Sequence, residues 1–152
     1  LAMQKPMRIL EVGTAVGFSA ILMAQYAPAD CKIVTIENYE KRIPVAKENF
    51  KRAGKDEQIT LLEGDAMQIL PTLSGEFDMI FMDAAKGQYI NFMPDILRLL
   101  KSGGVLVSAH PAALGMTPQP NKNPTEESPA GSFFWAGQSF PTKLRNGNGQ
   151  IS

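Results

Sequence analysis

The chain has 152 residues, 44% of them hydrophobic, which is enough to bury one core, so we expect a single domain. Lys plus Arg and Asp plus Glu both number 15, and this balance gives no reason to expect nucleic acid or an anionic membrane as a partner. The only cysteine, Cys31, excludes an internal disulfide framework, and no apolar stretch reaches the roughly 20 residues of a membrane span. We therefore expect a soluble, cytoplasmic protein without a secretory leader.

Short β-rich runs alternate with amphipathic segments in the first two thirds of the chain. We predict strands at about 8–12, 32–37, 58–63, 77–82 and 103–108, and helices at about 17–27, 40–53, 66–73 and 88–101. This alternation predicts an α/β fold, with a doubly wound, mainly parallel, Rossmann-like sheet that carries helices on both faces. Ligands bind such sheets beyond the carboxyl ends of the strands.

A glycine-rich turn, Glu11-Val12-Gly13-Thr14-Ala15-Val16-Gly17, follows the first predicted strand. Glycine carries no Cβ and accepts positive φ, so backbone can approach a ligand closely there. Glu37 ends the second strand, twenty residues beyond Gly17, where a carboxylate can accept hydrogen bonds from a ribose diol. The spacing is G-x-x-x-G and not G-x-G-x-x-G, which disfavours a nicotinamide-dependent oxidoreductase. The pattern predicts a site for a nucleoside that is smaller and less anionic than a dinucleotide.

Three of the five predicted strand ends carry a carboxylate, namely Glu37, Asp65 and Asp83. Each of the first two has a second interpretation as a helix cap, and for Asp65 a cap and a contact with an adenine ring are equally reasonable. Asp83 follows a fully apolar strand and precedes Ala84-Ala85-Lys86, which capping does not require. We therefore favour a functional role for Asp83.

The last predicted helix has an apolar face that starts at Tyr89 and recurs at helical spacing. Pro94 interrupts it, so the helix either starts near Pro94 or is kinked there. Gly103-Gly104 marks the stop before the fifth strand.

Five motifs occur in order along residues 8 to 108: Glu11 to Ser19, Ile36-Glu37, Glu63-Gly64-Asp65-Ala66, Phe77 to Tyr89, and Gly103 to Val107. Together they resemble the cation-dependent S-adenosylmethionine O-methyltransferases, especially the catechol and caffeoyl-CoA O-methyltransferases and their bacterial homologues. The glycine turn alone is a weak signal, whereas the ordered set with its D-A-x-K-x-x-Y string is specific.

The resemblance implies that S-adenosylmethionine is the cofactor. The implied cofactor-binding residues are Glu11, Gly13, Thr14, Gly17, Ser19, Glu37, Asp65, Ala66 and Asp83. It also implies that Asp83 is a catalytic residue and a ligand of Mg²⁺, which lowers the pKa of the acceptor hydroxyl, and that Lys86 is a catalytic base or charge-stabilising group. Lys86 read by itself is equally a solvated surface lysine, and Tyr89 is either near the site or part of the core.

The chain departs from the family pattern after the fifth strand. Ala109-His110 stands where the family has an Asp-Asn pair that completes the metal site. His110 is a potential ligand of a transition metal, but an exposed loop residue is the simpler interpretation. Residues 1–108 are expected to form the cofactor-binding core, and the Pro-, Asn-, Gly- and Ser-rich residues 109–152 an irregular tail. We therefore expect a truncated family member whose tail is not the family's own. The cluster Phe133-Phe134-Trp135 either docks on the sheet edge or has no role.

Two functions follow from these patterns. The first is S-adenosylmethionine-dependent transfer of a methyl group to a small catechol or phenol, or to a hydroxylated tRNA base, with a homodimer expected for the full-length parent and no membrane partner. The second is a degenerate, non-catalytic cofactor-binding module that keeps the nucleoside site and lacks the metal and acceptor half.

Overall fold

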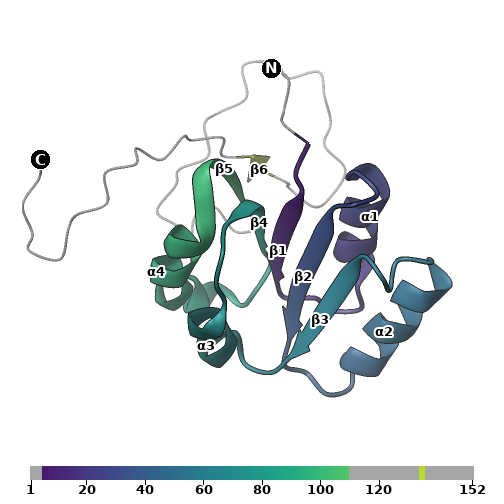
Figure 1. Ribbon diagram of the computed structural model, residues 1–152. Coiled ribbons are helices and arrows are strands. Elements are labelled where there is room, and N and C mark those ends of the chain that lie inside the picture. Colours follow the sequence, from purple (N-terminus) through teal and green to yellow (C-terminus); the bar gives the residue numbers. More distant parts are fainter. Residues whose placement is uncertain (1–4, 110–133, 136–152) are drawn as a thin grey trace, which may run out of the picture.

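The computed structural model describes residues 5–109 and 134–135, apart from the side chains of Lys86, Phe134 and Trp135 (Figure 1). Five parallel strands and a short antiparallel sixth form one sheet in the order β3-β2-β1-β4-β5-β6. The elements are β1 (Arg8–Val12), α1 (Phe18–Tyr26), β2 (Lys32–Glu37), α2 (Ile43–Arg52), β3 (Ile59–Glu63), α3 (Ala66–Ile69), η1 (Leu70–Thr72), β4 (Phe77–Met82), η2 (Lys86–Gln88), α4 (Tyr89–Leu99), β5 (Leu100–Ser108) and β6 (Phe134–Trp135).

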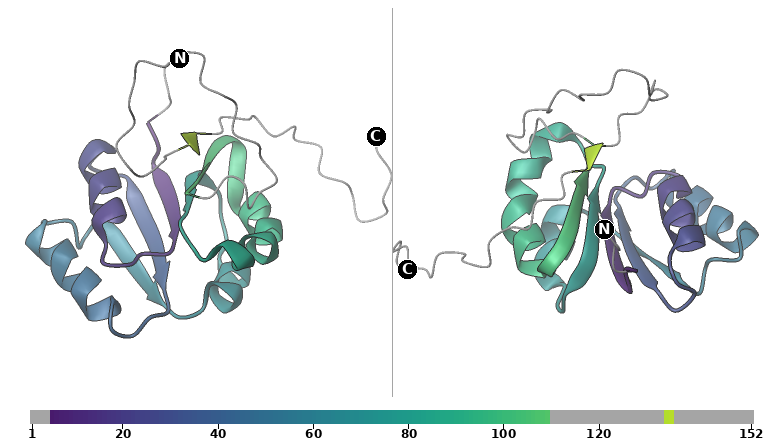
Figure 2. Two further views of the ribbon diagram at one scale, coloured as in Figure 1. Left: turned by 180° about the vertical axis from the view of Figure 1, so that it is seen from behind. Right: turned by 90° about the horizontal axis from the view of Figure 1, so that it is seen from above.

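Helices cover both faces of the sheet, which confirms the predicted α/β, doubly wound architecture (Figure 2). Alternate residues of β1 point to opposite faces, because side chains alternate along a strand. Ile9 packs with Ala20 of α1 and Phe50 of α2, whereas Leu10 packs with Phe92 and Ile96 of α4. Two hydrophobic clusters therefore sandwich the sheet. None of the described helices is long and apolar enough to cross a membrane.

The strand order reverses between β1 and β4, which are neighbours at the centre of the sheet. The chain runs outward from β1 through β2 to β3, then returns to β4 on the other side of β1. The loops after β1 and β4 therefore leave in opposite directions and open a crevice at the carboxyl ends of these strands. In open α/β sheets this switch point is where ligands bind.

Some boundaries differ from the predicted ones. Helix α4 begins at Tyr89, so a start near Pro94 is wrong; the exposed Pro94 lies inside the helix. Strand β5 begins at Leu100, which pairs with Phe77, and the pairing resumes at Val105 with Met79. The register shifts between these pairs, and local sequence does not reveal the shift because it depends on pairing with β4.

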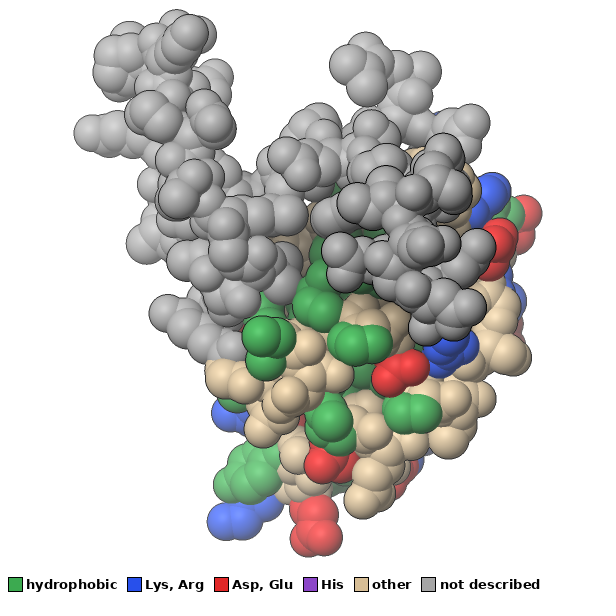
Figure 3. Space-filling view, turned by 90° about the vertical axis from the view of Figure 1, so that its left-hand side faces the viewer, with side chains coloured by type: hydrophobic (Ala, Val, Ile, Leu, Met, Phe, Trp, Pro, Cys, Tyr) green, Lys and Arg blue, Asp and Glu red, His purple; other side chains and the backbone are tan. Residues whose placement is uncertain are grey.

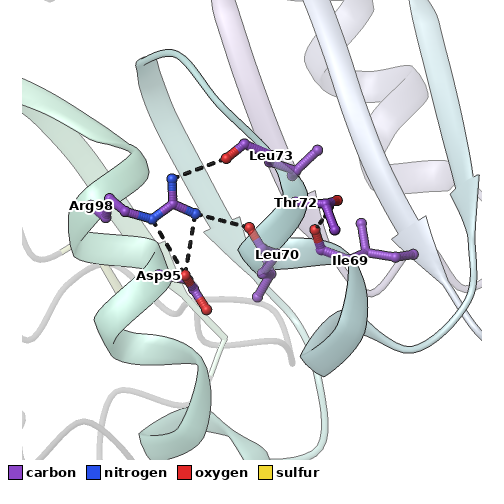
Figure 4. Close-up of polar contacts among 6 residues, drawn as sticks. All are labelled: Ile69, Leu70, Thr72, Leu73, Asp95 and Arg98. Atoms are coloured by element: carbon purple, nitrogen blue, oxygen red, sulfur yellow. Dashed lines mark hydrogen bonds and ion pairs between the residues drawn. The ribbon is translucent and has the colours of Figure 1, made fainter.

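The predicted helix 66–73 is split into α3 and the 3-10 turn η1, which is tied to α4 by Arg98 (Figure 4). The Arg98 guanidinium donates to the carbonyls of Leu70 and Leu73, each at 3.0 Å, and forms an ion pair with Asp95 at 3.2 Å. The Leu70 carbonyl also accepts the N–H of Leu73 at 3.2 Å. Arg98 adds a side-chain donor at the end of the turn, where backbone carbonyls run out of helical partners.

The outer surface over α3 and α4 has scattered hydrophobic side chains among polar and charged ones (Figure 3). Met67 of α3 and Ile90 of α4 are exposed. Single exposed apolar residues are normal on a soluble surface and indicate no particular site.

Strand β6 pairs antiparallel with the end of β5, with Trp135 opposite Val107 and Phe134 opposite Ser108. The sequence leaves two alternatives for the apolar cluster at 133–135, docking on the sheet edge or no role. The backbone pairing of residues 134–135 with β5 agrees with docking. The rest of 110–152, including His110, lies outside the described residues.

Candidate functional site

A cavity of about 370 Å³ opens at the carboxyl ends of the first four strands, at the switch point. It is lined by Val12, Gly13, Ala15, Ile36, Glu37, Asn38, Arg42, Gly64, Asp65, Ala66, Asp83, Ala84, Ala85, Gln88 and Phe92. The list includes five of the predicted site residues: Gly13, Glu37, Asp65, Ala66 and Asp83. Segments far apart in the chain thus meet where the strand-end rule expects a ligand.

Both glycines of the turn after β1 are required by its geometry. Gly13 has φ of 102°, and a Cβ at this position would lie 2.3 Å from the carbonyl oxygen of Asp83. Gly17 has φ of 93°, and its Cβ would lie 2.6 Å from the Phe50 ring. L-residues rarely adopt such φ values, and both positions are too crowded for a side chain. The turn therefore brings bare backbone to the cavity wall at Gly13.

Glu37, the last residue of β2, connects the turn after β1 with the loop after β2. Its carboxylate accepts backbone N–H bonds from Ala15 at 2.7 Å, Asn38 at 3.1 Å and Tyr39 at 3.0 Å. A carboxylate has about four lone-pair sites, so roughly one is left for a ligand. Glu37 is only 7% exposed, and it lines the cavity. It is thus a preorganised acceptor, held in place by the turn that follows β1 and by its own loop.

Glu11 lies behind the turn, on the face of the sheet that packs against α1, and it does not line the cavity. Its carboxylate accepts hydrogen bonds from Ser19 and, at 2.6 Å, from Thr35, whose hydroxyl is 2.6 Å from that of Thr14. Burial raises the pKa of Glu11 from 4.5 to about 7, despite the hydroxyl bonds that lower it. Glu11 and Ser19 therefore support the turn from behind. The cavity wall includes none of four predicted cofactor-binding residues, namely Glu11, Thr14, Gly17 and Ser19.

The loop after β3 forms the far end of the cavity. Asp65 is the N-cap of α3, and its carboxylate accepts the Met67 N–H at 2.9 Å. The cap interpretation of Asp65 is thus confirmed, while its position on the cavity wall leaves it available to a ligand as well. Ala66 lies beside it, and Gly64 donates its N–H to the Glu37 carbonyl at 2.9 Å. This bond keeps the β2 and β3 ends together.

Asp83 follows β4 directly, beside the glycine turn, and donates its backbone N–H to the Val12 carbonyl at 2.9 Å. Its carboxylate is exposed and is a suitable oxygen ligand for Mg²⁺. Within residues 5–109 and 134–135, however, no group of three or more His, Cys, Asp or Glu side chains could hold a metal ion. The described residues therefore do not make up a metal centre. Lys86 starts η2, but its side chain is outside the described part.

Tyr89 belongs to the core. Its ring is fully buried, and its hydroxyl donates to the Met82 carbonyl at 2.8 Å. Burial raises the pKa of the Tyr89 phenol above its ordinary value. The residue therefore fastens α4 to the end of β4, immediately before Asp83, and its hydroxyl is not presented to the cavity.

Several residues of the cavity wall were not predicted, among them Asn38, Arg42 and Gln88. Asn38 carries a weak signal, since it follows Glu37 directly. Arg42 carries none, because its place on the wall depends on the turn that connects β2 to α2. Gln88 precedes α4 and reaches the cavity through the position of η2.

Comparison with known proteins places this site in a family. A family model described as O-methyltransferase matches residues 1–127. The chain belongs to the O-methyltransferase family. The match covers every element from β1 to β5, so it includes all the predicted site residues and the complete cavity wall.

Relatives within the O-methyltransferase family include enzymes named for two acceptors. The chain is 40% identical over 104 residues to a catechol O-methyltransferase of Niastella koreensis, which covers 66% of this chain and 47% of the relative. It is 36% identical over 107 residues to a caffeoyl-CoA O-methyltransferase of Medicago sativa, covering 64% of this chain and 42% of the relative. The chain thus spans less than half the length of these curated relatives.

Solved structures of O-methyltransferases and related methyltransferases share the fold of this chain. A methyltransferase of Podospora anserina bound to S-adenosylhomocysteine aligns with a TM-score of 0.67 and 38% identity, over 81% of this chain and 54% of that one. TomG of Streptomyces achromogenes, in complex with S-adenosylmethionine, aligns with a TM-score of 0.66 and 32% identity, over 77% and 56%. The Rossmann-like fold is therefore shared with methyltransferases that hold S-adenosylmethionine or S-adenosylhomocysteine.

Proposed function

We propose that this chain binds S-adenosylmethionine and transfers its methyl group to a hydroxyl oxygen of a small catechol or phenol. One observation carries the proposal: a nucleoside-sized cavity at the switch point is lined by Gly13, Glu37, Asp65 and Asp83 together. The cofactor-bound relatives support the choice of cofactor, and the name of the Niastella koreensis relative supports the choice of acceptor.

The residues suit the parts of this cofactor. Glu37 has a remaining acceptor site for a ribose hydroxyl, the bare backbone at Gly13 admits the methionine part, and Asp65 with Ala66 flanks the adenine. When bound, S-adenosylmethionine supplies a methyl carbon already activated by its sulfonium. The protein therefore has to align the acceptor oxygen with this carbon and to remove the proton of the hydroxyl.

Asp83 and Lys86 belong to the acceptor half of the site. We assign Asp83 to the reacting end, because it follows β4, on the other side of β1 from Glu37, lines the cavity and is exposed. Lys86 is proposed as the base by its place in the family motif. A small acceptor is preferred to a tRNA base because equal numbers of acidic and basic residues give no attraction for a polyanion. A buried free thiol, Cys31, agrees with a cytoplasmic location.

Calorimetry with S-adenosylhomocysteine, with and without Mg²⁺, tests the cofactor half. Mass spectrometry of catechol incubated with the protein and S-adenosylmethionine, again with and without Mg²⁺, tests the acceptor half. We expect one-to-one binding and a methylated product. Asp83→Asn should reduce product formation at least tenfold, whereas Asp56→Asn, an exposed carboxylate remote from the cavity wall, should not. Binding without methylation would support the degenerate module instead, and no binding at all would defeat both functions.

A further inference from the structure

Arg42 is a cation at the nucleoside end of the cavity. It is the only basic side chain among the described residues that line the cavity, where Glu37, Asp65 and Asp83 are acidic. None of the ion pairs found in the described part of the chain includes Arg42. Its guanidinium instead lies over the ring of Tyr39, 5.2 Å from the ring centroid. A guanidinium that lines a ligand cavity without an ion-pair partner has a face available for a ligand.

One short turn fixes Arg42 relative to the acceptor for the ribose. The carboxylate of Glu37 binds the N–H of Tyr39, and the carbonyl of Tyr39 accepts the N–H of Arg42 at 2.9 Å. The same carbonyl accepts the N–H of Ile43 at 3.3 Å, where α2 begins. The Glu37 carboxylate and the backbones of Tyr39 and Arg42 thus belong to one hydrogen-bonded turn, from which the Tyr39 ring and the Arg42 guanidinium project. A ribose held at Glu37 would bring its base close to the wall formed by Asn38 and Arg42.

The charge around the cavity limits which ligand group can meet Arg42. Three carboxylates on the same wall oppose a phosphate or another anion. A neutral purine meets no such repulsion, and a guanidinium stacks well on aromatic faces because it is planar and weakly hydrated. The guanidinium already lies over one aromatic ring, that of Tyr39, which can support it while its other face meets a ligand.

We propose that Arg42 is a specificity-determining residue of the nucleoside site, which stacks its guanidinium on the adenine ring of the cofactor, and that Tyr39 is the residue that positions it. The purine would then lie between Arg42 on one side and Ala66 with Asp65 on the other. This inference rests on the proposed function, since it assumes an adenine nucleoside in the cavity.

Calorimetric titration with S-adenosylhomocysteine tests the role of Arg42. We expect Arg42→Ala to weaken binding about threefold to tenfold, the range of a partly exposed cation–π contact. Arg42→Lys should recover only part of this loss, because an ammonium keeps the charge but has no planar face. Lys41→Ala is the matched control, an exposed neighbour that is not on the cavity wall, and it should bind as wild type does.

The role of Tyr39 is tested by a conservative pair. Tyr39→Phe keeps the ring and should keep the affinity, whereas Tyr39→Leu should weaken binding although Tyr39 is not on the cavity wall. Because Tyr39 acts through Arg42, the double variant with Arg42→Ala should bind no more weakly than Arg42→Ala alone. Thermal melting of each variant shows that it is folded.

The inference is overturned if Arg42→Ala binds as wild type does, or if Arg42→Lys restores full affinity, because charge alone would then suffice. It is also overturned if the losses of the Tyr39→Leu and Arg42→Ala variants simply add. Failure of the wild-type protein to bind S-adenosylhomocysteine is a different result, and it would reject the proposed function itself.

Discussion

Replacement of Gly13 by alanine should damage both the fold and the cofactor site. The φ of 102° lies outside the regions open to L-residues, where even the left-handed region costs about 1–2 kcal/mol. The added Cβ would also stand 2.3 Å from the Asp83 carbonyl oxygen and 2.9 Å from its carbon. These are backbone atoms at the end of β4, so relief requires β1 and β4 to move apart, at a cost of about 1–3 kcal/mol. We expect a total loss of about 2–5 kcal/mol of unfolding free energy.

Gly54→Ala is the matched control for this prediction. Gly54 also has a positive φ, 67°, but nothing lies within 4 Å of the Cβ that would be added. This variant should therefore lose only the backbone strain, about 1–2 kcal/mol, and keep full affinity for S-adenosylhomocysteine. Urea unfolding gives the two free energies, and calorimetry gives the affinities. Equal losses of stability for both variants, with unchanged binding by Gly13→Ala, would refute the reasoning.

Three further predictions concern the residues that support the site. Since burial raises the pKa of Glu11 from 4.5 to about 7, the folded state binds a proton more tightly than the unfolded state. The unfolding free energy of the wild-type protein should therefore fall as the pH rises from 4.5 to about 7. Glu11→Gln removes this proton uptake. The unfolding free energy of the variant minus that of the wild type, measured by urea titration, should therefore rise by about 3 kcal/mol as the pH rises over this range. Parallel curves of unfolding free energy against pH would contradict this. Arg98→Ala removes donors from two carbonyls at the end of η1 and should lower the thermal midpoint by the equivalent of about 1 kcal/mol, unlike Arg52→Ala on the exposed end of α2. Tyr89→Phe removes the phenol donor from the buried Met82 carbonyl, which keeps the N–H of Ala109 at 3.0 Å, and should cost about 1 kcal/mol in the same melt; an unchanged thermal midpoint would contradict this.

The strands were predictable because buried parallel strands are apolar on both faces and end at glycine or carboxylate signals. Residues 79–82 are such a run, and they form the end of β4, whose bounds are those predicted. The start of β5 was not predictable, since Leu100 enters the sheet through its pairing with Phe77 across a register shift. The helix predicted at about 88–101 is α4, Tyr89–Leu99. Pro94 left open a start near it or a kink, and the packing of Tyr89 and Phe92 in the core rules out the later start.

The candidate site was predictable where it depends on strand ends. Gly13 and Asp83 come directly after strands and Glu37 is the last residue of one, so the topology alone brings them together. The place of Glu11 is different, because a strand residue one position before the cavity wall points to the opposite face of the sheet. Arg42 could not be predicted, since it reaches the wall through the fold of the turn that connects β2 to α2.

A crystal structure of this chain with S-adenosylhomocysteine would test the central claim most directly. We predict density for the nucleoside in the cavity at the switch point, with a ribose hydroxyl roughly 2.6–3.2 Å from the carboxylate of Glu37 and the methionine part against the backbone of Gly13. A ligand bound elsewhere, or a ribose without contact to Glu37, would contradict the account.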